Sequence, residues 1–371
     1  MVESLRLEMN FLSPIHIGSN NTALPYEYYM DRNVVYLLDL NKLLSISKIA
    51  DFFKQNIFNQ LEEKSSLASL NSKTNILYKQ LAEKNKLEIF SVDSIKITDT
   101  VLRYLSDATS RERQGKESLR QIILFPRNPF PYIPGSSIKG AIRTGFLDFL
   151  AENDKNCGHF DKKAQKLEHC LLGGLSEKGK GEATALFYKT YFQYIFVEDV
   201  SVKGKTSIVR VGNHSMTKRN RSSIETNREV IFSKNRDDLI QLNVNIDVQR
   251  CKKSAGKDMD FKKILRGASS SYVRKMEEDL NRIKKSVLNN KDEIVSFYEN
   301  IINEVNTSSE LYLLRLGWGS GYNSVTIKKY RRIKGKPAQF PIKGKPGQGW
   351  GYSINLAERR WPLGWVMLRI L

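Results

Sequence analysis

A helix start that could bind phosphate lies in the segment 134–143, which reads Pro-Gly-Ser-Ser-Ile-Lys-Gly-Ala-Ile-Arg. We expect a helix from about Ser136 to Glu152, capped at Ser136, because the apolar residues that follow have helical spacing. The first N–H groups of a helix are unpaired and attract anions, and residues four apart share one helix face. The predicted phosphate contacts are Ser136, Ser137, Lys139 and Arg143.

This segment is not a Walker loop, because Ala141 stands where that motif requires lysine. The sequence therefore gives little support to ATP binding. An ordinary capped helix that carries solvated basic residues is the alternative interpretation.

A second candidate site is a glycine-rich loop at 315–324, which reads Arg-Leu-Gly-Trp-Gly-Ser-Gly-Tyr-Asn-Ser. It follows an expected strand at 311–316, and it lacks the spacing of a dinucleotide-binding loop. Such a loop can bring backbone amides to a phosphate and an indole face to a base. The predicted RNA contacts are Gly317, Trp318, Gly319, Ser320 and Gly321. A tight turn around a core tryptophan is the alternative.

Two strongly basic stretches could contact a nucleic-acid backbone. One surrounds Tyr330 and the other lies at 218–221. Phosphate contacts combined with aromatic stacking are typical of proteins that bind single strands. A solvated run of charge is the alternative for both stretches. The predicted contacts are Lys218, Arg219, Arg221, Lys328, Lys329, Arg331 and Arg332.

Histidine and cysteine offer few further sites. His16 follows the first expected strand and could act as a general base, although no partner is visible, so a structural or RNA-contacting role is favoured. A cluster of zinc-type ligands has none of the usual spacings, and we predict no metal and no other cofactor. The cluster consists of Cys157, His159, His169 and Cys170.

The charge of the chain indicates a polyanionic partner. The 371 residues carry a net charge of +20. Residues 202–236 hold 9 basic and 2 acidic side chains, 250–285 hold 12 and 5, and 317–371 hold 11 and 1. Such clustering favours nucleic acid over a membrane surface. No apolar run approaches the roughly 20 residues of a membrane span. Only three cysteines are present, which fits a reducing compartment, so we expect a soluble cytoplasmic protein.

The expected elements alternate between half-buried strands and long helices, which indicates an α+β protein. Leu5, Leu7, Met9 and Phe11 alternate with polar residues and predict a first, antiparallel strand. We expect a domain at 1–190 and a second, with basic loops, at 191–371. Further strands are expected at 34–40, 119–125, 194–202, 239–248 and 363–371. Helical segments are expected at 41–61 and 258–305, and a long loop or hairpin at 203–236.

Five segments in this order resemble the repeat-associated mysterious protein (RAMP) superfamily of CRISPR systems. They read LSPIHIG, IPGSSIKGAIRT, YIFVEDVSV, RLGWGSGYNS and PLGWVMLRIL, and they span nearly the whole chain. IPGSSIKGAIRT is the most specific of them. Within the superfamily, the order of segments is most similar to the fifth-subunit family of the type III-A (Csm) effector complex. The resemblance implies two ferredoxin-like (RRM-type) domains with antiparallel sheets.

The resemblance also implies a role. Members of that family are non-catalytic and bind the guide RNA (crRNA) at its 3′ end, beside the repeated RAMP backbone subunit and other Csm subunits. They contribute to crRNA maturation, in which host nucleases trim the 3′ end. By matching motif, the helix start would face the RNA backbone, and His16 falls in the first-strand motif.

Two alternatives stay open. A metal-independent ribonuclease that acts on precursor crRNA would use His16 as the base and Lys139 as an electrostatic helper. A zinc-stabilised scaffold would use its positive surface mainly to bind proteins.

Overall fold

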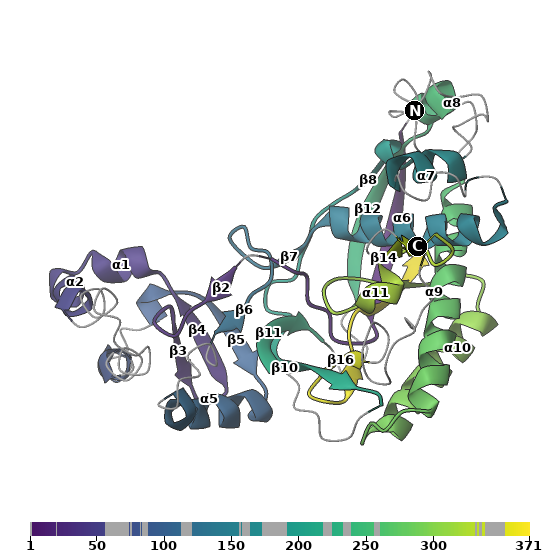
Figure 1. Cartoon of the computed structure of the whole chain (residues 1–371). Helices are drawn as coiled ribbons and strands as arrows, with labels where there is room; N and C mark the ends of the chain where they lie inside the picture. The colour runs from purple at the N-terminus through teal and green to yellow at the C-terminus, as the bar shows by residue number, and fades with distance from the viewer. Residues whose placement is uncertain are drawn as a thin grey trace.

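The protein is described by a computed structural model of the whole chain (Figure 1). The structure describes residues 2–19, 21–55, 74, 76–81, 83, 88–112, 121–155, 157, 164–172, 191–217, 225–232, 239–255, 260–330, 332–333, 336–337 and 353–371.

A five-stranded antiparallel sheet forms the centre of the larger part of the molecule. Its order is β13-β18-β1-β12-β8. The strands are β1 (Val2–Phe11), β8 (Ile195–Val197), β12 (Ile240–Asp247), β13 (Leu311–Arg315) and β18 (Trp365–Ile370). The predicted alternation of β1 is confirmed, because Leu7, Met9 and Phe11 are fully buried. One face of this central strand therefore contributes directly to the core.

Three long helices pack with this sheet into the main hydrophobic core. They are α6 (Gly135–Asn153), α9 (Phe261–Lys284) and α10 (Lys291–Thr307). The helix expected at 136–152 is confirmed. The long helical region expected at 258–305 is confirmed as two helices, because the chain turns between α9 and α10. Lys285 N–H donates to Arg282 O and Ser286 N–H to Ile283 O, which ends α9 and lets α10 pack back against it.

A second sheet follows the order β2-β6-β11-β10-β5-β4-β3, with β16 on β10 and β17 on β16. In Figure 1 it extends from the main part toward α1 (Leu40–Leu44) and α2 (Ser47–Phe53), with α5 (Asp99–Glu112) alongside. Two of its pairings, β10 with β5 and β11 with β6, are parallel. The strands are β2 (Thr22–Ala23), β3 (Tyr28–Asp31), β4 (Val34–Leu38), β5 (Ser91–Ile97), β6 (Ile122–Ile123), β10 (Thr206–Ser215), β11 (Glu225–Ile231), β16 (Ser353–Ala357) and β17 (Trp361–Pro362).

The prediction of an α+β protein is confirmed, and most strand pairs are antiparallel, apart from the two parallel pairs of the second sheet. The two ferredoxin-like domains stay a prediction. The boundary at residue 190 also stays a prediction. Both sheets combine strands from the two sides of it, since β1 pairs with β12 and β18, and β5 pairs with β10. The hairpin alternative for 203–236 is confirmed by the β10–β11 pair. In the described part of the chain, no helix is long and apolar enough to cross a membrane.

Candidate nucleic-acid interface

The glycine-rich loop lies directly against the segment that follows β1. Trp318 N–H donates to His16 O at 2.8 Å. Gly317 has φ +77°, and a Cβ there would lie 2.3 Å from the same oxygen. Only glycine allows both this backbone conformation and this close approach. The structure thus brings together two sites that are 300 residues apart in the sequence.

His16 is buried and neutral. Its Nδ1–H donates to Glu229 O at 2.7 Å, while no described residue hydrogen-bonds to Nε2. Phe125 and Trp318 meet the imidazole edge-on, with ring centroids 5.9 and 6.1 Å away. Burial is the main cause that lowers the pKa of His16 to about 4; the hydrogen bond to Glu229 O opposes this shift, and the charge of Arg228 adds to it. A fully buried imidazole positions the loop, and it is not accessible as a general base.

Several polar atoms of the loop form hydrogen bonds within the protein. Ser320 Oγ donates to Gly317 O at 2.9 Å, and Asn355 Nδ2 donates to Gly319 O at 3.2 Å. Gly321 has φ +81° and begins the short helix α11 (Gly321–Ser324). Trp318 remains 39% exposed. The exposed feature of the loop is therefore an indole, and the predicted core tryptophan of the alternative interpretation is not found.

Arg315, which precedes the loop, is a residue that sequence reasoning missed as an anchor. Its guanidinium is buried and donates to Leu363 O, Asp279 Oδ2 and Ser324 Oγ at 3.0, 3.0 and 3.2 Å. It also lies 4.6 Å from the centre of the Trp365 ring. These contacts connect both ends of the glycine loop to the core. The sequence signal was available, since this arginine interrupts an otherwise apolar strand.

At the start of α6, the structure corrects the predicted serine cap. Pro134 is the N-cap, and Gly135 N–H donates to the carboxylate of Asp199 at 2.7 Å. A Cβ at Gly135 would lie 1.9 Å from Val197 O, so glycine is required for the helix to begin beside this backbone. The Asp199 carboxylate already accepts a hydrogen bond from the first amide of the helix, and its negative charge complements the helix dipole. Ser136 is exposed and Ser137 is half-buried.

The two basic residues of this helix differ in their contacts. Arg143 Nε donates to Glu168 Oε1 at 2.7 Å, and Nη2 binds the other oxygen of the same carboxylate. Glu168 lies on α7 (Ala164–Leu171), so this pair joins two helices. Lys139 Nζ lies 5.9 Å from the centre of the Phe196 ring, and burial, with the charge of Arg143, lowers its pKa. Among the described residues Lys139 has no ion-pair partner, whereas Arg143 has one.

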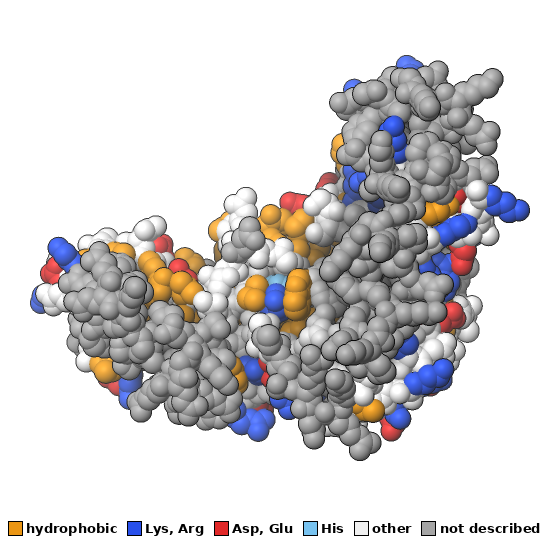
Figure 2. Space-filling view, in the orientation of Figure 1, with side chains coloured by type: hydrophobic (Ala, Val, Ile, Leu, Met, Phe, Trp, Pro, Cys, Tyr) orange, Lys and Arg blue, Asp and Glu red, His pale blue; other side chains and the backbone are white. Residues whose placement is uncertain are grey.

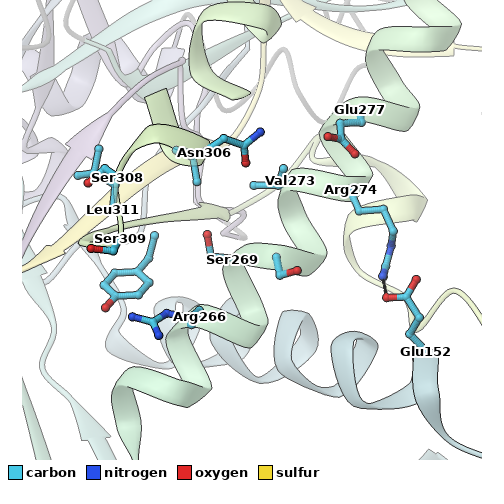
Figure 3. A pocket seen from close by; sticks show the side chains of 13 residues that line it. Glu152, Arg266, Ser269, Val273, Arg274, Glu277, Asn306, Ser308, Ser309 and Leu311 are labelled. Carbon is cyan, nitrogen blue, oxygen red and sulfur yellow. Dashed lines mark ion pairs between the residues drawn. The ribbon is translucent and has the colours of Figure 1, made fainter. Parts of the chain in front are cut away.

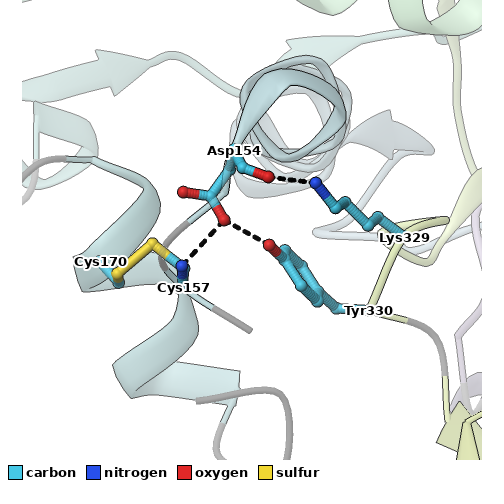
Figure 4. Close-up of a disulfide and its surroundings, with 5 residues drawn as sticks. All are labelled: Asp154, Cys157, Cys170, Lys329 and Tyr330. Atoms are coloured by element: carbon cyan, nitrogen blue, oxygen red, sulfur yellow. Dashed lines mark hydrogen bonds between the residues drawn. A yellow bond between two sulfur atoms is a disulfide. The ribbon is translucent and has the colours of Figure 1, made fainter. Parts of the chain in front are cut away.

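The basic loop after α11 is anchored by its own predicted RNA contacts. Lys328 N–H donates to Asp148 Oδ1 at 2.6 Å, and its ammonium pairs with Glu278. Figure 4 shows Lys329 and Tyr330 donating to Asp154, at the end of α6. The loop is therefore held against α6 and α9. Lys218, Arg219, Arg221 and Arg331 lie outside the described residues, as does the side chain of Arg332.

The sulfur atoms of Cys157 and Cys170 are bonded to each other in a disulfide (Figure 4). This corrects the alternative of a zinc-stabilised scaffold that uses both cysteines, because sulfurs that are bonded to each other are not thiolate ligands. The bridge joins the segment after α6 to α7, beside Asp154. His159 and the side chain of His169 lie outside the described residues. No group of three potential metal ligands occurs among the residues described.

A groove of about 480 Å³ lies between α9, the end of α10 and the start of β13 (Figure 3). Its rim carries the ion pair of Arg274 with Glu152, and serines and Arg266 line it. Its lining is mostly polar. None of the predicted site residues lies in it.

Comparison with known proteins places the chain in a family. The sequence pattern of the RAMP superfamily matches residues 8–324. A protein of Methanocaldococcus jannaschii named CRISPR system Cms protein Csm5 is 22% identical over 350 residues, which cover 87% of this chain and 73% of that protein. A Streptococcus thermophilus protein of the same name is 26% identical over 174 residues, or 44% and 45% of the two chains.

Solved structures share the fold. A chain in the cryo-EM structure of a Csm–crRNA–target RNA ternary complex of a type III-A CRISPR-Cas system has a TM-score of 0.63 at 20% identity, covering 99% of this chain and all of that one. The crystal structure of T. onnurineus Csm5 has a TM-score of 0.58 at 20% identity, covering 97% and 99%. The predicted resemblance is confirmed, and the chain belongs to the RAMP superfamily.

Proposed function

We propose that the chain is a non-catalytic RNA-binding subunit of a type III-A CRISPR effector complex, which caps the 3′ end of the crRNA and supports its maturation. The observation that carries this proposal is similarity along nearly the whole chain to Csm5 proteins and to a chain of a Csm–crRNA–target RNA complex. The partners would be the crRNA, the repeated RAMP backbone subunit, other Csm subunits, and host nucleases for 3′ trimming.

The local geometry supports a binding role at the glycine-rich loop. The loop presents an exposed indole on a backbone that the core fixes in place, which suits stacking of an unpaired base. The chain carries a net charge of +20, which supports attraction to the RNA backbone. Lys139 near the start of α6 has no ion-pair partner among the described residues and is available to a phosphate.

The same geometry disfavours the ribonuclease alternative. The His16 ring contacts Phe125, Trp318 and a backbone carbonyl, and within the described part of the chain no proton donor or acceptor bonds to Nε2. Lys139, the proposed helper, lies over Phe196. Incubating the purified protein with repeat RNA in EDTA tests this alternative, and RNA cleavage that is abolished in His16→Gln would support it over the binding role.

The direct test is co-purification. The tagged chain is expressed with its neighbouring genes, and the bound RNA is sequenced. We expect short repeat-spacer RNAs together with sister subunits, and untrimmed 3′ ends when this chain is omitted. Recovery of the chain free of RNA and subunits would refute the proposal. Lys139→Ala should reduce RNA recovery, whereas the control Lys284→Ala, which removes a lysine already paired with Glu299, should not.

A further inference from the structure

Arg228 on β11 is a buried arginine that no carboxylate of the described residues pairs with. Its guanidinium carbon lies 3.4 Å from the centre of the Trp318 ring, and the residue is 8% exposed. Its Nε donates to Thr226 Oγ1 at 3.0 Å. Within the described part of the chain, no acidic side chain pairs with its terminal nitrogens. Its partners among the described residues are therefore an indole ring and a hydroxyl group, and no carboxylate.

Arg210 on the neighbouring strand provides an internal comparison. It is equally exposed, at 8%, and its guanidinium lies 3.2 Å from the centre of the Tyr104 ring. Unlike Arg228, it donates to Glu225 from Nε and Nη2 at 3.1 and 2.9 Å. Two arginine–aromatic stacks thus lie on paired strands, and only one of them is neutralised by the protein.

The buried charge of Arg228 persists at neutral pH. Burial lowers its pKa to about 10, and the guanidinium remains protonated. A buried charge without a counterion is costly, because its hydration is lost without a compensating interaction. The terminal nitrogens of an arginine suit an anion with several oxygens, above all a phosphate.

The surroundings select the kind of anion. Trp318 is 39% exposed and is held by the glycine-rich loop, so a partly exposed indole and a guanidinium stacked on its face lie together. In Figure 2, basic and hydrophobic side chains lie together near the centre of the face of the molecule that is drawn. An arginine stacked on an aromatic ring extends the planar surface on which a base can stack.

We propose that Arg228 and Trp318 form a nucleotide-binding position for single-stranded RNA. The phosphate binds the terminal nitrogens of Arg228, and the adjoining base stacks on the Trp318–Arg228 pair. This inference rests on the proposed RNA-binding function and adds a residue that the glycine-loop motif does not contain. A carboxylate of a neighbouring protein subunit is the competing occupant.

The test measures binding of the full chain to single-stranded RNA that contains 2-aminopurine, at several salt concentrations. Arg228→Gln should weaken binding at least about tenfold and reduce the slope of log K against log salt by about 0.7, the value for one phosphate on a single strand. Arg228→Lys should restore the slope but not the full affinity. Trp318→Leu should weaken binding about 5- to 150-fold and abolish the fluorescence change on stacking, whereas Trp318→Phe should retain part of it.

Two controls separate binding from folding. Lys284→Gln removes the same charge from an exposed ion pair and should leave the affinity within about twofold. Without RNA, Arg228→Gln should unfold at the same or a higher temperature, because it removes an uncompensated buried charge. If Arg228→Gln unfolds at a lower temperature and binds RNA with unchanged affinity, Arg228 has a structural role and the inference is overturned.

The remaining outcomes distinguish the two proposals. If the wild-type chain binds RNA and Arg228→Gln binds it with unchanged affinity and slope, the inference is wrong and the proposed function stands. If Arg228→Gln retains RNA but loses sister subunits on co-purification, the anion is a protein carboxylate and the inference is likewise wrong. If the wild-type chain binds no RNA, the proposed function fails and the inference fails with it.

Discussion

Replacing Asp148 by asparagine should destabilise the junction between α6, α9 and the basic loop. The carboxylate is 2% exposed and accepts from Ser271 Oγ at 2.6 Å, Arg274 Nη2 at 2.8 Å and Lys328 N–H at 2.6 Å. Lys275 Nζ, in a side chain with no exposed surface, lies 3.3 Å from it. Removing one partner of a buried ion pair costs about 3–5 kcal/mol, because the other charge stays buried. We therefore expect Asp148→Asn to lower the free energy of unfolding by about 3–5 kcal/mol.

Urea unfolding of the full chain measures this change from the midpoint and slope. Glu152→Gln is the matched control, because Glu152 pairs with the same Arg274 but is half exposed, so its loss should cost less than about 1 kcal/mol. Combining Asp148→Asn with Lys275→Met should recover about 2 kcal/mol or more, since the buried ammonium of Lys275 is then absent. A cost below about 1 kcal/mol for Asp148→Asn, or no recovery in the double variant, would refute the reasoning.

The same carboxylate predicts a loss of stability in acid. Burial by itself would raise the pKa of Asp148, but the charges of Lys275 and Arg274 and the hydrogen bonds from Ser271 and Lys328 hold it below its ordinary value of 3.8. Its stabilisation is therefore present above pH 3.8 and is lost as the pH falls through the folded-state value. Asp148→Asn should lower stability at neutral pH and remove this part of the acid dependence, which urea titrations from pH 7 to pH 3 would detect.

Two other changes test the loop and the disulfide. Gly317→Ala places a Cβ 2.3 Å from His16 O at a left-handed backbone position, so it should lower the free energy of unfolding by at least about 2 kcal/mol. Gly140→Ala, in α6 with nothing within 4 Å of the added Cβ, should raise it by about 0.5–1 kcal/mol in the same urea assay. Equal effects of the two substitutions would contradict the close approach assigned to Gly317. For the bond between Cys157 and Cys170, thiol titration in denaturant should count one thiol per chain before reduction and three after it, and three before reduction would contradict the bond.

Local pattern was sufficient for the elements whose burial follows a simple period. The alternation of β1 and the helical spacing after Ser136 placed both elements within a few residues of the observed bounds. The strand before the glycine-rich loop was predicted for the same reason, because its apolar run is short and ends at glycine. The break between α9 and α10 was missed, since the apolar spacing continues across the turn.

The pairing of distant segments could not be read from local pattern. That His16 lies beneath Trp318, that Asp199 rather than a serine caps α6, and that Lys328 binds Asp148 all depend on which strands become neighbours. Sequence spacing therefore identified the glycine-rich loop and the helix start as candidates, but it could not distinguish basic residues that the protein neutralises itself from those it leaves unpaired. Arg228 and Arg210 show this, because both occur in one basic stretch, and only the tertiary contact with Glu225 neutralises one of them.

The sequence by itself determined the α+β class, the main strands and helices, the positive charge and the RAMP resemblance, because periodicity, composition and motif order are properties of the chain. Only the tertiary structure decided the burial of His16, the disulfide and the unpaired guanidinium of Arg228. Burial and the availability of a charge depend on atoms contributed by residues far away in the sequence, and folding alone brings those atoms together.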